Sequence, residues 1–466
     1  MSESEIAAVE SAEDSHDDED RLKPEFVRAV LDCVEAGDQE GARALVAPLH
    51  PADIADLFEL VPAEERQALA AALAEMLDAD VFAELNDWVR DELIEDLDAN
   101  QVADIAGQLD TDDAVAIIAD LEEDEQRAVL RALDPDDRAA IEEALSFPEE
   151  SAGRLMQREL IAVREHMTVG DLLDYLRSNE DLTTDFWEVF VVDPAHRPVG
   201  TLKLSWVLRT PRNIELSDVM QREQTLIPVD MDQEEVALRF QKYGLISAAV
   251  VDQAGRLVGM ITVDDILHIV QEEAGEDVLK LSGAGEGDIN QPIRLTVRTR
   301  LTWLVVNLGT AMIAASVVGA FQGTIAHFAL LAVLMPIVSG MGGNAGTQTL
   351  AVVVRALATN QLTSSNTVRM ILRELRIAAA NGAALGLLIG CGTFILFANA
   401  SLAVVIAMAM VINNLVAGLA GVMVPVGLEK AGADPAVSSA VFVTMMTDVM
   451  GFFSFLGLAT LWGLGG

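Results

Sequence analysis

The chain has 466 residues with 30 basic and 74 acidic side chains and a net charge of −44, yet 51% of it is hydrophobic and its mean hydropathy is +0.33. Residues 1–292 hold 70 acidic and 22 basic side chains, whereas residues 293–466 hold 4 and 8. These figures exclude a uniform soluble domain and a nucleic-acid-binding protein that works through basic patches. The two cysteines, Cys33 and Cys391, stand in opposite halves and exclude a disulfide scaffold.

Residues 1–22 are acidic and contain no apolar core, which predicts a disordered tail without a secretion signal. Residues 23–150 then repeat short phrases such as DANQVADIAGQL and DTDDAVAIIADL. Each phrase starts with Asp, Pro or Glu and continues with apolar residues at helical spacing. A series of such short helices predicts an all-α superhelical N-terminal domain.

The pattern changes in residues 151–214 and recurs in residues 215–271, where each half has a helical stretch, a β run, a turn and a second β run. This order, present twice, resembles that of a pair of CBS modules, which are regulatory α/β units. The second β run of such modules often ends in a Thr and an Asp that hold a nucleotide. The second half has these as Thr262 and Asp265, and the first half lacks them. At most one site for an adenine nucleotide such as ATP is therefore predicted.

Residues 272–292 predict a connecting helix and a Gly-rich linker, and residues 293–466 predict a five-helix transmembrane domain. Five segments reach the length of about 20 apolar residues that a span needs. They lie at about 301–323, 328–354, 375–398, 402–428 and 437–463. Because basic loops stay in the cytoplasm, the positions of Lys and Arg predict a multi-pass protein of the cell membrane. In this topology residues 1–292 are cytoplasmic and the C-terminus is extracellular.

Asp448 is expected near the middle of the fifth span, with Thr444 one helical turn before it on the same face. A carboxylate at that depth costs about 2.5–3.5 kcal/mol on insertion scales, so it needs a partner or water. No basic residue is expected at the same depth. Two alternatives stay open, a functional cation site and a buried neutral acid that holds helices together.

The second predicted span contains PIVSGMGGNAGTQT, residues 336–349, where Pro336 and four glycines predict a break in the helix. Non-helical backbone at this depth occurs where it is packed in protein or lines a wet cavity, and broken helices aim carbonyls at ions. Close helix packing through small residues is the alternative. The pore-lining candidates are Gly343, Asn344, Gly346, Thr347, Asn413, Asn414 and Thr444.

The order of parts, with the pieces GMGGNAGTQ, ADPAVSS and TDVMGF, resembles the MgtE family of magnesium channels and transporters over residues 23–466. The resemblance implies a homodimer in membrane lipid, with the pore between the subunits and Mg2+ as both transported and regulatory ion. It places Asp448 in the pore and Asp434 in a cytosolic loop. The acids that it implies for Mg2+ sensing are Asp232, Glu234, Asp265, Glu273, Glu276 and Asp277.

The predicted function is Mg2+ uptake through a magnesium-selective channel or transporter, which closes when cytosolic Mg2+ neutralises facing carboxylates. The alternative is a secondary divalent-cation transporter coupled to H+ or Na+, which could also carry Co2+ or Mn2+. An anion channel would need basic pore groups, and no nucleophile–base pair, phosphate loop or metal-binding His cluster that an enzyme would use stands out. Only 5 of the 30 basic residues are Lys, which indicates that solubility in high salt accounts for most of the acidity.

Overall fold

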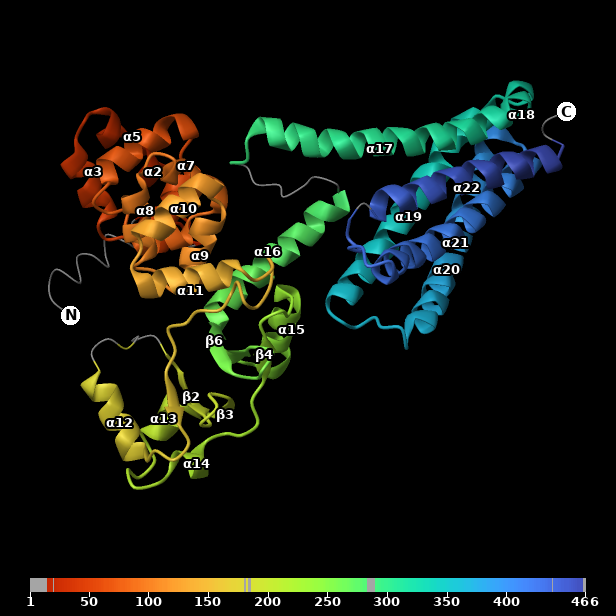
Figure 1. The fold of residues 1–466 in the computed structure, drawn as a ribbon. Helices are drawn as coiled ribbons and strands as arrows, with labels where there is room; N and C mark the ends of the chain where they lie inside the picture. Colours follow the sequence, from red (N-terminus) through yellow and green to blue (C-terminus); the bar gives the residue numbers. More distant parts are fainter. Residues whose placement is uncertain are drawn as a thin grey trace. The chain divides into compact units, whose positions relative to one another are not determined.

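The structure is a computed structural model that describes residues 15–19, 21–179, 182, 186–282, 290–437 and 439–463; of Asp277 it describes the backbone alone. The chain divides into two compact units, Met1–Gln271 and Glu272–Gly466. The first unit holds a helical domain and two small sheets, and the second holds five long apolar helices (Figure 1). The predicted class, a multidomain membrane protein with these parts, is confirmed.

The helical domain contains ten short helices in the described residues, and their apolar faces meet in one core. Asp98, the first residue of one repeated phrase, caps its helix by accepting hydrogen bonds from the backbone N–H groups of Asn100 and Gln101. Asp110, Glu122 and Asp134 begin later phrases without a side-chain cap, so those helices rest on the spacing of their apolar residues. The apolar stripe of each helix then faces the core. The helices are α2 (Pro24–Glu35), α3 (Gln39–Val46), α4 (Pro51–Leu60), α5 (Ala63–Leu73), α6 (Ala79–Glu84), α7 (Asp87–Ile94), α8 (Ala99–Ala106), α9 (Thr111–Ala119), α10 (Glu123–Ala132) and α11 (Pro135–Leu145).

Part of the predicted disordered tail is ordered against the helical domain. His16 forms a β-bridge with Leu22, and its Nε2 lies 3.1 Å from a carboxylate oxygen of Asp53. Leu22 is buried in the core of the helical domain. The prediction is wrong for residues 15–19 and 21–22 because their high charge hid the apolar anchor at the end of the segment.

The two CBS modules have the same sheet topology, in which the first and second strands are parallel and the second and third antiparallel. Phe190 of the first sheet and Met260 of the second share one apolar cluster. The elements are β1 (Ala162–Arg164), α12 (Val169–Ser178), β2 (Glu188–Val192), β3 (Pro198–Lys203), α13 (Leu204–Val207), α14 (Leu216–Val219), β4 (Leu226–Pro228), α15 (Gln233–Tyr243), β5 (Ser247–Val251) and β6 (Leu257–Thr262).

The second unit contains the five predicted spans, each long and apolar enough to cross a membrane. α21 is central, because it packs against α19, α20 and α22, whereas α17 packs mainly against α22 and leaves most of its apolar surface uncovered. Helix α16 (Val263–Ser282) begins in the first unit, directly after β6, and ends in the second. The remaining helices are α17 (Ile293–Ala320), α18 (Gln322–His327), α19 (Leu330–Ala358), α20 (Thr367–Phe397), α21 (Ala400–Lys430) and α22 (Ser439–Leu461).

The predicted break at residues 336–349 is wrong, because α19 is one continuous helix that contains Pro336. Proline removes a single N–H donor, and two of the four glycines, Gly342 and Gly346, serve packing instead. A Cβ atom on Gly342 would overlap Nδ2 of Asn413, and one on Gly346 would lie 2.5 Å from Cγ1 of Val443. These glycines let α19 approach α21 and α22 closely, which is the packing alternative that the sequence left open.

Candidate ion site and acidic clusters

Asp448 lies half-buried on α22 and faces α19. The hydroxyl of Ser339 on α19 donates a hydrogen bond to its Oδ1. Sequence reasoning missed Ser339, since 109 positions separate the two residues and only helix packing brings them together. The pair combines a carboxylate and a hydroxyl at membrane depth, and both present oxygen, the ligand atom that Mg2+ prefers.

Asn413 is fully buried where α19, α21 and α22 cross. Its Nδ2 donates a hydrogen bond of 2.8 Å to the carbonyl of Val338, the residue next to Ser339. Its Oδ1 accepts no hydrogen bond from the described residues. The hydrogen bond from Nδ2 fixes the orientation of the amide. Its Oδ1 is therefore a second acceptor, besides the Asp448 carboxylate, at the level of Ser339.

The other predicted pore-lining residues are divided between two environments. Gly343, Asn344 and Thr347 lie on a less covered side of α19, where a Cβ atom on Gly343 would meet nothing within 4 Å. The Thr347 hydroxyl donates to the carbonyls of Gly343 and Asn344 at 3.1 and 3.0 Å. Gly346 is buried in the helix packing, and Thr444 is half-buried one turn before Asp448. Asn414 faces a different pocket, described below.

Three carboxylates meet between the helical domain and the second CBS module: Asp112 and Asp113 at the start of α9, and Asp265 at the start of α16. Burial, followed by repulsion from Asp265, raises the pKa of Asp112 well above its ordinary value. The same two causes raise the pKa of Asp113 to about 6. Burial also raises the pKa of Asp265. The hydrogen bond of 2.7 Å that the Thr262 hydroxyl donates to this carboxylate lowers the pKa, but burial has the larger effect. We call these three residues the acidic cluster.

Sequence reasoning found Asp265 but missed Asp112 and Asp113, because the helical repeats contain many equivalent acids. Of the other predicted sensing residues, Asp232 caps α15 by accepting from the Glu234 N–H at 2.9 Å, and Glu273 is half-buried on α16. The Asp277 side chain lies outside the described residues. Across the part of the chain that the structure describes, no three His, Cys, Asp or Glu side chains are close enough to hold a metal ion as they stand.

Glu276 and Asp434, both predicted to bind Mg2+, are bridged by Lys280. Its Nζ lies 2.6 Å from Oε1 of Glu276 and 3.1 Å from Oδ2 of Asp434. Burial alone would lower the pKa of Lys280, but hydrogen bonds to the two carboxylates outweigh burial and raise it. The neighbouring Leu281 packs against an apolar cluster that includes Leu350 of α19. An ammonium group therefore ties the end of α16 to the loop before α22.

Replacing Lys280 with Met is expected to loosen the end of α16 while keeping the aliphatic contact. The two ion pairs are about one-third exposed, so each contributes about 0.2–1 kcal/mol, and their loss leaves two carboxylates facing each other. Amide hydrogen exchange over residues 276–282 should therefore speed up about fivefold in the absence of Mg2+. Lys430→Met, an exposed lysine at the end of α21, is the matched control. Equal exchange in both variants would contradict the tie.

Comparison with known proteins gives a consistent result. A family model described as a divalent cation transporter (MgtE) matches residues 335–458, one for the MgtE intracellular N domain matches residues 49–150, and one for the CBS domain matches residues 216–272. The magnesium transporter MgtE of Bacillus subtilis is 32% identical over 318 residues, which are 68% of this chain and 70% of that protein. The magnesium transporter MgtE of Thermus thermophilus is 33% identical over 324 residues, 68% and 72% of the two chains.

A solved structure of the cytosolic domain of the Mg2+ channel MgtE in complex with ATP is 29% identical, covers 52% of this chain and 99% of its own, and has a TM-score of 0.48. The soluble part of a magnesium transporter is 24% identical, covers 54% and 98%, and has a TM-score of 0.47.

Proposed function

The chain belongs to the MgtE family, whose transmembrane model is that of a divalent cation transporter, and from this premise we propose that it is a magnesium-selective channel or transporter for Mg2+ uptake. The observation that carries the proposal is Asp448, a carboxylate inside a predicted span whose described partner is the neutral hydroxyl of Ser339. Among the described residues this carboxyl group has no cationic partner, and such a group at this depth suits a passing cation. Mg2+ keeps most of its water, so a few oxygen ligands are sufficient.

The proposed protein is a homodimer with its pore on the two-fold axis, where two Asp448 carboxylates face each other. Their mutual repulsion favours a divalent over a monovalent ion. Asn413 and the uncovered side of α19, with Gly343, Asn344 and Thr347, are proposed to line the same path. The proposed orientation puts residues 1–292 in the cytoplasm and the C-terminus outside. The loops that carry most of the Lys and Arg lie on the same side of the membrane as residues 1–292, and basic loops stay in the cytoplasm.

Closure by cytosolic Mg2+ is proposed to act through the soluble acids. In the acidic cluster, three carboxylates lose hydration and repel one another, which opposes the compact arrangement until a cation neutralises them. A site at ten times its dissociation constant stabilises the bound form by about 1.4 kcal/mol. Shifting the ratio of closed to open channels from 1:99 to 99:1 takes about 5.5 kcal/mol, so roughly four such sites are enough. These sites are proposed to lie at the acidic cluster and at the predicted sensing residues Asp232, Glu234, Glu273, Glu276, Asp277 and Asp434. At Glu276 and Asp434 the ion would have to replace Lys280.

ATP binding at the second CBS module remains a prediction. The Thr262 hydroxyl and the Asp265 carboxylate are hydrogen-bonded to each other at the start of α16, so a nucleotide would have to displace that bond. Calorimetric titration of the full chain with ATP is the direct measurement, and the absence of heat would remove ATP from the proposal.

Flux into liposomes that contain the purified full chain tests the transport proposal. Mg2+ entry should occur without an imposed H+ or Na+ gradient and should be reduced by Mg2+ on the cytoplasmic side. Flux that requires either gradient would favour the coupled divalent-cation transporter instead. Adding Co2+ or Mn2+ as competitors ranks the ions that the path accepts.

A further inference from the structure

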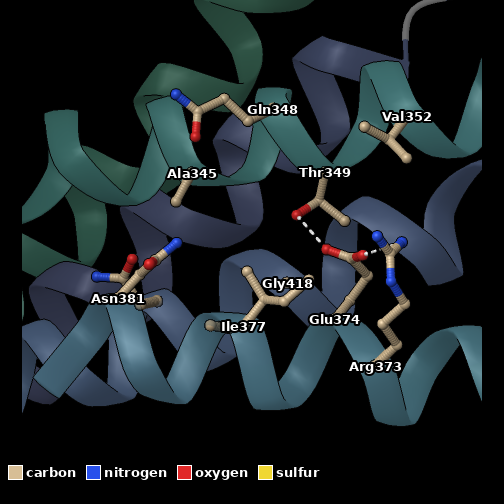
Figure 2. Close-up of a pocket in the computed structure, with 11 residues that line it drawn as sticks. Ala345, Gln348, Thr349, Val352, Arg373, Glu374, Ile377, Asn381 and Gly418 are labelled. Carbon is tan, nitrogen blue, oxygen red and sulfur yellow. Dashed lines mark hydrogen bonds and ion pairs between the residues drawn. The ribbon is translucent and has the colours of Figure 1, made fainter.

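A second polar pocket lies between α19, α20 and α21 (Figure 2). Its volume is about 210 Å3. On the helix α19, Thr349 at this pocket is ten residues beyond Ser339, which corresponds to about 15 Å at a rise of about 1.5 Å per residue. The pocket is therefore separate from the Asp448 level. Its polar lining residues are Gln348, Thr349, Arg373, Glu374, Asn381 and Asn414.

Glu374 gives the pocket a buried negative charge, since its exposed fraction is 6%. Its Oε2 accepts a hydrogen bond of 3.4 Å from the Thr349 hydroxyl, and its Oε1 accepts one of 3.2 Å from Nη1 of Arg373. Figure 2 shows the two donors on either side of the carboxylate. The Arg373 side chain is 61% exposed and only one residue from Glu374 in sequence, so little packing holds it in place and it can turn away and leave Oε1 to another cation.

Asn414 supplies an independent sign that the pocket holds a buried acceptor without a donor among the described residues. The residue is 1% exposed, and its Nδ2 donates a hydrogen bond of 2.9 Å to the carbonyl of Met410. This bond fixes the amide orientation, because a reversed amide would set two oxygens against each other. Its Oδ1 accepts nothing from the described residues, although a buried acceptor without a partner costs about 1–3 kcal/mol. A bound cation, or the water that it carries, would satisfy this oxygen.

We propose that this pocket binds a hydrated divalent cation, held by the Glu374 carboxylate and the Asn414 amide oxygen. The acceptors repel an anion and favour a cation or the donor face of its water shell. The pocket volume of about 210 Å3 leaves room for several waters. Because a small divalent ion such as Mg2+ gives up its waters reluctantly, we expect it to keep its hydration shell there. Arg373 occupies the carboxylate when the ion is absent and leaves when it binds. The site gives the transmembrane unit a second cation-holding level besides Asp448.

The test counts Mn2+ bound to the full-length chain in lipid nanodiscs by electron paramagnetic resonance. All samples carry Asp448→Asn, so the outcome is independent of the proposed pore. Glu374→Gln should lose one bound Mn2+ per chain or weaken that site about tenfold or more, as expected for losing one charged ligand. Glu429→Gln removes the same charge from an exposed position at the end of α21 and should leave binding unchanged. Identical curves for these two variants would overturn the proposal.

Two further measurements test whether the effect of Glu374→Gln comes from misfolding and whether the site prefers a divalent to a monovalent ion. Arg373→Gln removes the competing guanidinium and should tighten Mn2+ binding several-fold, which loss of structure would not do; unchanged or weaker binding would contradict the site. Hexamminecobalt(III), which has the size and donor shell of a hydrated divalent ion, should displace the Mn2+ that depends on Glu374. Equal displacement by Na+ at the same ionic strength would overturn the divalent assignment.

Discussion

Asp448→Asn is expected to lower Mg2+ flux in liposomes by at least about 100-fold while leaving the protein folded. A divalent ion and a carboxylate 4 Å apart attract by about 8 kcal/mol at an effective dielectric near 20. Losing even one-third of this attraction changes binding by about 100-fold. Asn has the same shape and keeps an oxygen that can accept the hydrogen bond from Ser339, so the contact between α19 and α22 is retained.

Two companion variants separate charge from packing at this site. Ser339→Ala keeps the carboxylate but removes its hydrogen bond, and we expect a loss of flux of about tenfold, in line with about 1.5 kcal/mol for a bond to a charged group. Glu429→Gln removes one negative charge from the exposed end of α21 and should transport normally. Flux close to that of the unmodified chain in Asp448→Asn would mean that the carboxylate only joins helices.

The compactness of the soluble unit in the absence of Mg2+ is expected to depend on pH through the acidic cluster. The pKa values of Asp112, Asp113 and Asp265 are all raised, that of Asp113 to about 6 from an ordinary value of 3.8. A raised carboxyl pKa means that the ionised form is disfavoured in the compact arrangement. The penalty is fully present above about pH 6 and is relieved as the pH falls toward 4. Protons should therefore substitute for Mg2+ at low pH.

Limited proteolysis of the full-length chain measures this effect. Without Mg2+, cleavage between the helical domain and the CBS modules should be fast at pH 7.5 and at least about tenfold slower at pH 5, since one unit of pKa shift is about 1.4 kcal/mol. Added Mg2+ should protect strongly at pH 7.5 and little at pH 5. The double substitution Asp112→Asn and Asp265→Asn should protect at both pH values and remove the response to Mg2+.

Asp124→Asn is the matched control, because Asp124 is a highly exposed acid of the same helical domain. Its response to pH and Mg2+ should be that of the unmodified chain. If the double variant still requires Mg2+ for protection at pH 7.5, sensing occurs elsewhere, and the tie of Lys280 to Glu276 and Asp434 becomes the next place to look.

The sequence by itself determined which segments form spans, which form CBS modules and which form helical repeats, because these depend on local periodicity and capping. Asp98 caps its own helix, and each of the five apolar segments is long enough to cross a membrane. Neither property depends on distant parts of the chain. It also singled out Asp448, since a carboxylate within about 20 apolar residues is costly in any arrangement. The order of the residues around Leu22 was not predicted, because a single apolar residue gives no recognisable pattern in a highly charged segment.

Only the tertiary structure decided what the glycines of α19 do and which polar groups meet. Gly342 and Gly346 were predicted to break the helix, yet they make room for Asn413 and Val443, partners that lie far away in the sequence. In the same way, Ser339 reaches Asp448, Lys280 joins Glu276 to Asp434, and Glu374 shares a pocket with Asn414 through helix packing alone. Local sequence sets each helix, but contacts between helices depend on their rotation and crossing, which no short stretch encodes.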